Sequence, residues 1–428
     1  MGKAYFCGAV DSRTFPRGRD ISHENGASES RHTLIEQILA LALEHIGMDV
    51  AVLAEFSDGN EVLRVIVGDS ASFDLRPDAA IPFQDSYSRR LLEMPPKGLA
   101  PDARSDHRLR DVEQTPLVGA YIGVPVTMPD GRVYGSLSCL SRTPHPLLDE
   151  RDVKFLGVLA QLVGEELERW EEEVVEERKR LSRIRQMLDS GNGFRVAFQP
   201  IFDLRNRAVV GYEALSRFTG GPSRAPNEWF AEAAELGLGV ELEVAAVQAA
   251  LDSFEGMPGD AYVSVNVSPE AMTSSSFFQA ISGKAEDRLV VEVTEHARVE
   301  SYAELANVVL ALRGRGVRLA IDDVGAGFAS LRHVLRLRPD IIKLDITLTR
   351  SIDTDPVRRA LASSFIRFAD DIHATIAAEG IETGGELDEL CTLGVGCGQG
   401  FFLAEPGSLQ ELSLQGLGAA APLAATGS

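Results

Sequence analysis

Apolar runs of similar length alternate with amphipathic stretches through the second half of the chain. Most runs are nearly continuous in their apolar character, and amphipathic stretches such as 228–252, 302–315 and 356–371 separate them. This pattern is typical of a mostly parallel sheet. Eight such units within roughly 215 residues predict a (β/α)8 barrel, an α/β fold. The eight runs are VAFQPIF, VVGYEALSRF, AYVSVNVS, LVVEVTE, VRLAIDDVG, IIKLDITL, ATIAAEGIE and GQGFFLAEP.

A different order of elements is predicted for the first half. Apolar residues at helical spacing predict a helix over 32–46. Two pairs of strand-like runs, over 49–68 and 120–140, each enclose a turn signal, SDGN in the first pair and PDG in the second. A second helix is expected to begin near Asp149. One helix, two hairpins and a closing helix predict a compact α+β domain.

The closing helix is expected to continue beyond this domain. Apolar residues recur there at spacings of four and three, with Glu177 as the one polar interruption, and charged residues flank them. Two structures fit this heptad pattern: one long solvated helix between domains, or a parallel coiled coil joining two copies of the chain. The repeated apolar positions favour the coiled coil. They are Val163, Leu167, Trp170, Val174, Leu181, Ile184 and Leu188, and are called the predicted seam below.

These patterns divide the chain into five segments. The first is polar and without a sustained period, and the last is rich in Ala, Gly, Leu and Ser, with a short helix expected in its first half. The predicted segments are a loose tail over 1–29, an α+β domain over 30–165, a helical linker over 166–190, the barrel over 191–408 and a frayed tail over 409–428.

Composition narrows the class of protein. The 428 residues are 44% hydrophobic and 25% charged, which excludes a mainly disordered chain. The formal net charge is −22. Such an acidic chain is a poor candidate for binding nucleic acid or an anionic membrane, because both need a basic surface. An anionic substrate would need local help from metal ions or a few placed cations.

The cysteines and the hydropathy indicate a cytoplasmic protein. The four cysteines, Cys7, Cys139, Cys391 and Cys397, are too few and scattered for a disulfide framework and are expected to be reduced. No stretch reaches the ~18 apolar residues of a membrane span. The beginning of the sequence lacks the apolar region of a signal peptide.

Polar side chains gather at the carboxyl ends of the predicted barrel strands, the edge at which barrel enzymes build their active sites. Any one of these carboxylates alone is more simply a solvated loop residue, but their recurrence at successive strand ends favours a site. So many carboxylates cannot all stay ionised together without cations. The set comprises six carboxylates, two amides and one lysine: Glu213, Glu292, Asp322, Asp323, Glu379, Glu382, Asn266, Gln399 and Lys343.

Two divalent metal ions would balance this charge. All the donors are oxygens, which favours Mg²⁺ or Mn²⁺ over Zn²⁺. Two such ions are common in enzymes that hydrolyse phosphodiesters, since they activate water and neutralise oxyanions. Lys343 beside two cations is expected to have a lowered pKa and to position or deprotonate that water.

The motifs in this half resemble those of the EAL family, the cyclic-di-GMP phosphodiesterases. The Glu-Ala-Leu signature lies in GYEALSRF, and FQPI, VNVS, VEVTE, IDDVGAGFASL, IIKLD, AAEGIE and GQGFFLAEP continue the match over about half of the chain. The resemblance implies cleavage of cyclic-di-GMP to linear pGpG with Mg²⁺ or Mn²⁺. No motif of the opposing cyclase occurs. The alternative is a receptor that binds cyclic-di-GMP without cleaving it, as in family members that have lost carboxylates.

The resemblance also implies roles for individual residues. It implies that Lys343 acts on the attacking water, that Glu379 lies near the metals and the water, and that Glu382 supports the site. The implied metal ligands are Glu213, Asn266, Glu292, Asp322 and Asp323, with Asp322 bridging two ions. The implied substrate contacts are Gln199, Arg217 and Gln399, and Glu295 is implied to anchor the glycine-rich loop after Asp323.

One position departs from the family pattern. The residue after the Asp pair is usually Phe, and here it is Val324. The loop relays dimer contacts to the metals in the family, so a smaller side chain there is expected to loosen this coupling.

The first domain resembles a GAF domain, a sensory or dimerising module. The run DGRVYGSLSCL, followed by an Asp that begins a long helix, carries most of this resemblance, over roughly residues 30–168. It implies a possible small-molecule ligand, which the sequence does not identify, and regulation of the barrel in a homodimer. Cys139 is expected in the core, and His107 and His145 at the surface.

Overall fold

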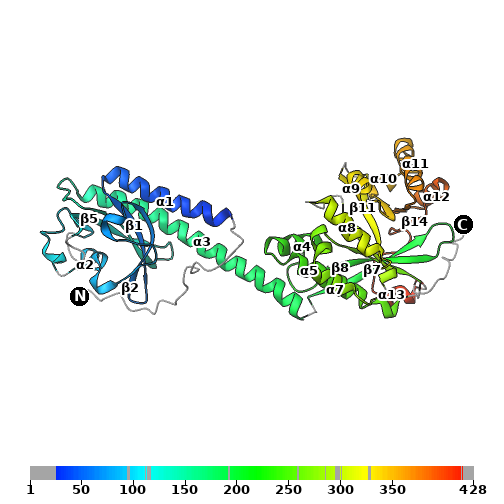
Figure 1. Ribbon diagram of the computed structural model, residues 1–428, viewed down its shortest axis with the longest axis horizontal. Helices are drawn as coiled ribbons and strands as arrows, with labels where there is room; N and C mark the ends of the chain where they lie inside the picture. The colour runs from blue at the N-terminus through cyan, green and yellow to red at the C-terminus, as the bar shows by residue number, and fades with distance from the viewer. Residues whose placement is uncertain are drawn as a thin grey trace. The chain divides into compact units, whose positions relative to one another are not determined.

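The computed structural model describes two compact units, which meet within one helix between Glu176 and Glu177 (Figure 1). None of the described helices is both long and apolar enough to cross a bilayer. The described residues are 26–93, 97–110, 112, 117–190, 193–257, 260–284, 286–294, 299, 301–325, 329–415 and 417.

The first unit is built on an antiparallel sheet of six strands, in the order β3-β2-β1-β6-β5-β4. The two predicted hairpins are its centre, since β1 pairs with β2 and β5 with β6. The strands are β1 (Val50–Ser57), β2 (Asn60–Gly68), β3 (Ala80–Pro82), β4 (Leu99–Ala100), β5 (Ala120–Thr127) and β6 (Val133–Ser141).

Two long helices cover one face of this sheet, and α2 (Tyr87–Glu93) packs on the other. Helix α1 (Gly26–Ile46) begins before the predicted start at residue 32, and α3 (Glu150–Ser190) begins where expected. Cys139 lies fully buried between the sheet and the long helices, and burial raises its thiol pKa to about 12. Three 3₁₀ turns complete the described elements of this unit: η1 (Ala71–Phe73), η2 (Phe83–Asp85) and η3 (His107–Leu109).

The long helix α3 is confirmed, but much of its predicted seam packs within the chain. Val163 and Leu167 are buried in the core of the first unit. Ile184 is buried against Trp229 in the second unit. An apolar residue every three or four positions therefore predicts that one side of the helix is buried. The pattern does not distinguish burial within one chain from burial between two chains.

The second unit is a closed eight-stranded barrel, as predicted, in the order β10-β11-β12-β13-β14-β7-β8-β9. Strand β7 runs antiparallel to both neighbours, while the other pairs are parallel. The strands are β7 (Phe194–Asp203), β8 (Val209–Phe218), β9 (Tyr262–Asn266), β10 (Leu289–Val293), β11 (Arg318–Val324), β12 (Ile341–Leu344), β13 (Thr375–Ala378) and β14 (Cys397–Gly398).

The last predicted strand is largely wrong. Of the run GQGFFLAEP only its first residue lies in β14, and the chain turns immediately after Gly400. Phe401 and Phe402 consequently project into solvent, with 64% and 49% of their surfaces exposed. Apolar continuity alone does not separate a buried strand from an exposed turn.

Helices surround the barrel and bury its outer apolar side chains in one core. They are α4 (Pro226–Glu235), α5 (Gly239–Leu251), α6 (Pro269–Thr273), α7 (Ser275–Ile281), α8 (Tyr302–Arg313), α9 (Ala329–Leu337), α10 (Ile346–Thr349), α11 (Pro356–Asp371), α12 (Gly384–Leu393) and α13 (Leu409–Leu414), with 3₁₀ turns η5 (Phe254–Gly256) and η6 (Glu286–Arg288). The predicted C-terminal tail thus begins with a short helix, and residues 416 and 418–428 lie outside the described part.

The end of α3 is fixed to the barrel unit by one buried carboxylate. Glu232 on α4 is 4% exposed and accepts hydrogen bonds from Arg180 and Arg183 of α3, each at 2.9 Å, and from Arg224. Burial would raise the pKa of Glu232, but the hydrogen bonds from these three guanidinium groups outweigh it and hold the pKa below its usual range. The carboxylate therefore stays charged at neutral pH and stabilises the junction.

Replacing Glu232 with glutamine is expected to lower the free energy of unfolding of the barrel unit by about 2 kcal/mol at pH 7, because three arginines lose their shared anion. A lowered carboxylate pKa stabilises the fold above about pH 4, so the difference should shrink only as the pH falls further. Urea unfolding measures it. The control Glu235→Gln removes an exposed partner of Arg180 and should cost less than about 1 kcal/mol. Equal costs for both variants would contradict this role.

Candidate active site

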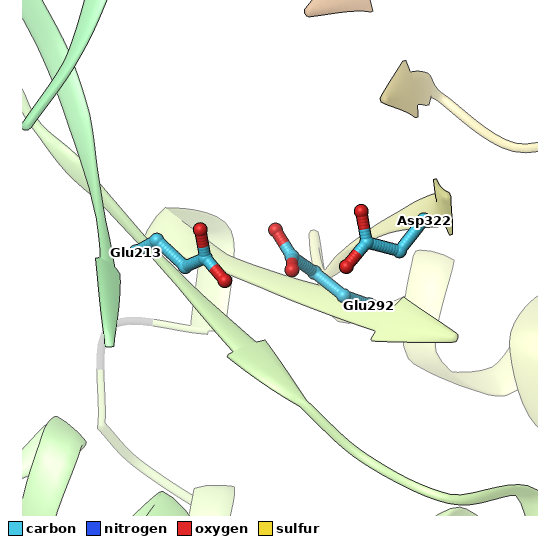
Figure 2. A group of neighbouring side chains, drawn as sticks. All are labelled: Glu213, Glu292 and Asp322. Atoms are coloured by element: carbon cyan, nitrogen blue, oxygen red, sulfur yellow. The ribbon is translucent and has the colours of Figure 1, made fainter. Parts of the chain in front are cut away.

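Four acidic side chains converge inside the barrel mouth from separate strands. Glu213 comes from β8, Glu292 from β10 and Asp322 from β11, and the three carboxylates point toward one another (Figure 2). Glu379 follows the end of β13. The register of the strands brings these side chains together. Glu292 pairs with Asn266 of β9, and Ser264, two residues before Asn266, pairs with Glu213. The predicted convergence of strand ends is therefore observed for these side chains.

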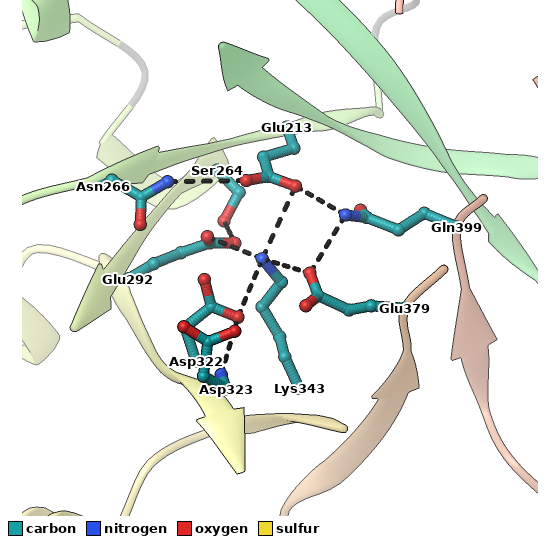
Figure 3. A network of polar contacts seen from close by, with 9 residues as sticks. All are labelled: Glu213, Ser264, Asn266, Glu292, Asp322, Asp323, Lys343, Glu379 and Gln399. Carbon is teal, nitrogen blue, oxygen red and sulfur yellow. Dashed lines mark hydrogen bonds and ion pairs between the residues drawn. The ribbon is translucent and has the colours of Figure 1, made fainter. Parts of the chain in front are cut away.

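Lys343 of β12 lies at the centre of this cluster (Figure 3). Its Nζ is 2.7 Å from Glu379 Oε1 and 2.8 Å from Glu292 Oε2. It is also 3.2 Å from Asp322 Oδ1 and 3.5 Å from Glu213 Oε2. One buried ammonium group thus faces four carboxylates, which leaves the cluster with excess negative charge.

Amide side chains hold the carboxylates in place around the lysine. Gln399 donates from Nε2 to Glu213 and, at 3.1 Å, to Glu379 (Figure 3). Asn266 Nδ2 lies 3.4 Å from Glu213 Oε1, and the same residue carries a carbonyl oxygen that faces away from this contact. These contacts fix the orientation of the two glutamates at the rim of the cluster.

Ser264 belongs to the site and was not predicted. Its hydroxyl donates to Glu292 Oε1. Ser264 and Asn266 lie two positions apart on β9, so both side chains point to the same face of the strand. The signal was therefore present in the run VSVN, where a serine alternates with buried valines.

The electrostatics of the cluster follow from burial and excess negative charge. Burial, reinforced by Glu213 and Asp322, raises the pKa of Glu292 to about 8 despite the nearby lysine. Burial also raises the pKa of Glu379 well above its usual range. For Lys343 burial works in the opposite direction, but the surrounding carboxylates outweigh it and raise the lysine pKa. The lowered lysine pKa expected beside two bound cations stays a prediction, because it depends on those cations.

Asp322 and Asp323 sit at the end of β11 in an unusual backbone conformation. The Asp323 φ is 56°, in the left-handed region that non-glycine residues rarely occupy. The Asp323 N–H donates to Asp322 Oδ1 at 3.0 Å. Left-handed backbone at such a position is typical of residues held in place for function. The turn directs two consecutive carboxylates into the barrel mouth, where an extended strand would point them to opposite faces.

The acidic groups fit a pair of divalent cations. Glu213, Glu292 and Asp322 each offer a carboxylate oxygen within 4.8 Å of the others. Asp322, Asp323 and Glu379 form a second group by the same measure. Asp322 is common to both, and every donor is an oxygen, as Mg²⁺ and Mn²⁺ prefer. The pKa values of Glu292 and Glu379 are raised first by burial and then by the neighbouring carboxylates, which a bound cation would offset.

Of the other predicted site residues, Gln199 lies beside the cluster, while Arg217 and Glu382 are exposed. Gln199 is buried on β7 beside Glu213 in register, and its Nε2 donates to the Ala404 carbonyl at 3.3 Å. The guanidinium of Arg217 is exposed and contacts the neighbouring backbone. Glu382 is 42% exposed and pairs with Arg350 at 2.6 Å. Glu295 lies outside the described residues.

The position that departs from the family pattern is a core position here. Val324 is fully buried, and it pairs with Leu344 across β11 and β12. Gly325 follows with a φ of 116°, and a Cβ there would lie 2.2 Å from Leu348. The start of the glycine-rich loop is therefore packed, and residues 326–328 lie outside the described part.

Comparison with known proteins decides the family. A sequence profile for the EAL domain matches residues 181–406, more than half of the chain. The chain belongs to the EAL domain family. A GAF domain profile matches residues 30–167, so both resemblances are confirmed. The exact domain boundaries given above remain predictions.

Relatives of the EAL domain carry phosphodiesterase names. The chain is 28% identical over 243 residues to the probable cyclic di-GMP phosphodiesterase PdeI of Escherichia coli, covering 52% of this chain and 30% of that protein. It is 28% identical over 244 residues to a cyclic di-GMP phosphodiesterase of Pseudomonas aeruginosa, covering 53% and 40%. The chain therefore spans well under half the length of these relatives.

A solved structure shares the fold over most of the chain. It is an EAL enzyme described with cAMP and cyclic-di-GMP bound. The match has a TM-score of 0.51 at 20% identity and covers 86% of this chain and 93% of that one. At this level of identity the likeness concerns the fold alone.

Metal binding to the EAL cluster is expected to strengthen as the pH rises from 6 to 8 and to release protons at pH 7. Glu292, with a pKa of about 8, holds a proton at neutral pH that a cation must displace, and the raised pKa of Glu379 acts in the same direction. Calorimetric titration with Mn²⁺ in two buffers of different ionisation enthalpy measures this release. Binding without proton release, and with equal affinity at both pH values, would contradict the prediction.

Proposed function

We propose that the EAL barrel hydrolyses one phosphodiester bond of cyclic-di-GMP to give linear pGpG, with Mg²⁺ or Mn²⁺ as cofactor. The observation that carries this proposal is the buried cluster of four carboxylates around Lys343. All four are acidic residues that the EAL motifs place at the barrel mouth. The names of the curated relatives support the choice of substrate. A receptor that only binds the nucleotide would not need every carboxylate.

The ligand roles follow from the two acidic groups. Glu213, Glu292 and Asp322 would hold one cation, with Asn266 beside them, and Asp322, Asp323 and Glu379 would hold the other. Two such ions activate water and neutralise charge that develops on the phosphate oxygens. Asn266 and Glu379 thus complete the two groups from neighbouring strand ends.

Lys343 and Glu379 would position the attacking water. Lys343 Nζ lies among the carboxylates that would hold the cations, where it would position the water or take its proton. Glu379 lies 2.7 Å from Lys343 Nζ, so a carboxylate of the second acidic group lies beside the lysine that acts on the water. Gln399 donates to Glu379 and fixes its orientation.

Residues at the rim would contact the dinucleotide. We assign Arg217 to a substrate phosphate, because its guanidinium is exposed four residues after Glu213. Gln199 is assigned to the nucleotide beside the cluster. Glu382 orders Arg350 at the mouth through their ion pair. Glu295 stays the proposed anchor of the glycine-rich loop.

Incubation of the full-length chain with cyclic-di-GMP tests the activity. Linear pGpG should form with Mg²⁺ or Mn²⁺, resolved by anion-exchange chromatography, and should not form with EDTA. A linear dinucleotide that lacks the cyclic diester serves as substrate control. Saturable binding of cyclic-di-GMP with metal present but without product would instead support the receptor.

We further propose that the enzyme is a cytoplasmic homodimer regulated through its GAF domain. The unpaired thiols of Cys139, Cys391 and Cys397 suit the reducing cytoplasm. A single helix, α3, belongs to both units, so a ligand-induced change in the GAF domain has a continuous element on which to act.

Breaking α3 tests the regulation. Glu177→Pro interrupts the helix where the two units meet, since proline removes a backbone hydrogen bond and clashes with the preceding turn. The rate of hydrolysis should change, while Glu177→Ala, which keeps the helix, should retain the wild-type rate. Equal rates for all three proteins would remove α3 as a route of regulation.

A further inference from the structure

The last residues of β8 extend beyond the barrel sheet. The pairing of β8 with β9 ends at Glu213, so residues 214–218 pair with β7 alone among the described strands. Arg217 and Phe218 end this extension, and Phe218 pairs with Phe194 of β7. Side chains alternate along a strand, so Arg217 shares the face of Glu213 while Phe218 lies on the other face. The barrel sheet alone therefore does not fix the position of Arg217.

Aromatic side chains hold the end of this extension. The Phe218 ring stacks on Trp229 of α4, with ring centroids 5.3 Å apart and an angle of 22° between the rings. Phe218 also lies against Phe194 and Phe230, at centroid distances of 5.7 Å and 5.6 Å. Trp229 is 1% exposed, and its indole N–H has no hydrogen-bond acceptor among the described residues. The Trp229 ring is therefore held by its faces rather than by its polar atom.

The loop that follows β8 packs on the same ring. Gly221 lies against it, because a Cβ added at Gly221 would be 2.7 Å from Trp229 Cη2. The guanidinium carbon of Arg224 lies 4.1 Å from the ring centroid, within the range of a cation–π contact. Trp229 thus contacts the chain at Phe218 and again at Gly221, both directly after Arg217.

The end of α3 packs against these aromatic side chains. Ile184 and Met187 of α3 share one hydrophobic core with Trp229. The guanidinium carbon of Arg183, also on α3, lies 5.6 Å from the Trp229 ring centroid. Met187 contacts the start of β7 as well, because a Cβ added at Gly193 would lie 2.5 Å from Met187 Cγ. A displacement of α3 would therefore act on both strands of the extension.

From these contacts we propose that Trp229 is a positioning residue for the substrate, which holds the end of β8 so that Arg217 meets a phosphate of cyclic-di-GMP. Because α3 contacts the same ring, α3 sets the affinity for substrate through Trp229. The inference rests on the function and regulation proposed above and names the step that is regulated. That step is binding, because Glu213 is held in the barrel by its pairing with β9 and the acidic cluster stays in place when the end of β8 moves.

Steady-state kinetics of the full-length chain with Mn²⁺ test this role. Trp229→Leu should raise KM for cyclic-di-GMP about tenfold and change kcat less than about twofold, because the Arg217 contact is made equally to substrate and transition state. Phe218→Leu removes the same stack at a half-buried position and should act alike. Trp229→Phe keeps a stacking ring and should retain the wild-type KM. An unchanged KM in both leucine variants, or a fall in kcat alone, would overturn the proposal.

A structural control separates positioning from loss of stability. Phe277 on α7 is fully buried in the barrel core, away from the β8 extension. Phe277→Leu should lower the melting temperature, as Trp229→Leu does, and should leave KM unchanged. A Phe277→Leu protein with the same rise in KM would show that any loss of stability weakens binding, and would overturn the positioning role.

Double variants show whether Trp229 acts through Arg217. Arg217→Ala alone should raise KM about tenfold, and adding Trp229→Leu to it should raise KM no further. Independent, multiplying effects would overturn the proposal. The contribution of α3 is tested in the same way: the change caused by Glu177→Pro should appear in KM and should vanish when Trp229→Leu is already present. A change that persists in that background would refute the route through the ring.

Binding measured without turnover separates this inference from the proposed activity. Equilibrium dialysis with EDTA gives the dissociation constant of cyclic-di-GMP when no hydrolysis is expected, and Trp229→Leu should raise it about tenfold. A wild type that binds but forms no pGpG would refute the proposed activity, and the ratio of the two dissociation constants would still decide the inference. Equal constants would overturn the inference even if pGpG forms. A wild type that neither binds nor cleaves would overturn both.

Discussion

Replacing Glu213 with glutamine is expected to reduce hydrolysis of cyclic-di-GMP about 10²–10⁴-fold and leave the barrel folded. The substitution removes one oxygen donor and one negative charge from the first acidic group, and cation stabilisation of a phosphoryl transition state is worth several kcal/mol. The amide oxygen can still accept the hydrogen bond from Gln399. Initial rates with saturating Mn²⁺ measure the loss.

The stability of this variant distinguishes a ligand from a structural residue. The Glu213 carboxylate is one cause of the raised pKa of Glu292 and Glu379, after burial itself, so removing it relieves repulsion. The melting temperature without metal should therefore be unchanged or higher. The exposed Glu241 on α5 provides the control, since Glu241→Gln should keep full activity. An inactive Glu213→Gln protein that is also unfolded would contradict the assignment.

Replacing Lys343 with methionine is expected to destabilise the metal-free barrel by about 3 kcal/mol and to abolish turnover. The ammonium is the counter-ion of four carboxylates, and removing one partner of a buried ion pair leaves uncompensated charge. For a domain of this size the loss corresponds to about 6–12 °C in melting temperature. Added Mn²⁺ should raise the melting temperature of the variant more than that of wild type, because a cation replaces the missing charge.

The pH dependence of this loss has a definite sign. Folding raises the pKa of Glu292 to about 8. This carboxyl group therefore contributes less and less to the stability of the fold as the pH rises toward 8. The stability of Lys343→Met should therefore fall further between pH 5 and pH 8 than that of wild type. Lys284→Met, which removes an exposed partner of Asp252, should cost less than about 1 kcal/mol. A variant as stable as wild type at pH 8 would contradict the role of Lys343.

The sequence predicts the barrel and its acidic cluster because both depend on local patterns. A buried strand reads as a continuous apolar run, and the residue that follows it lies at the mouth of the barrel. Glu292, Asp322 and Lys343 could be placed together on that ground alone. The distances from Lys343 Nζ to four carboxylates, all within 3.5 Å, could not be predicted, because only the folded register brings these groups together.

Where the prediction was incomplete, a pattern had two physical explanations. The predicted seam on α3 is apolar because its residues are buried, and Val163 and Ile184 are buried within the chain. The aromatic pair Phe401 and Phe402 continued an apolar run but lies in an exposed turn. The alternation in VSVN places Ser264 on the same face of the strand as Asn266, but it does not show that the serine hydroxyl reaches Glu292 of β10. Contacts between segments far apart in sequence decide each of these cases.

The central claim is that this chain cleaves cyclic-di-GMP at one of its two phosphodiesters. Phosphorus NMR of the full-length protein with cyclic-di-GMP and Mg²⁺ follows this directly, since the two diester phosphates of the substrate are equivalent. The account predicts that their single resonance gives way to one diester and one monoester resonance of equal intensity, and that Glu213→Gln prevents this. A substrate resonance that broadens on binding but never yields a monoester would contradict it.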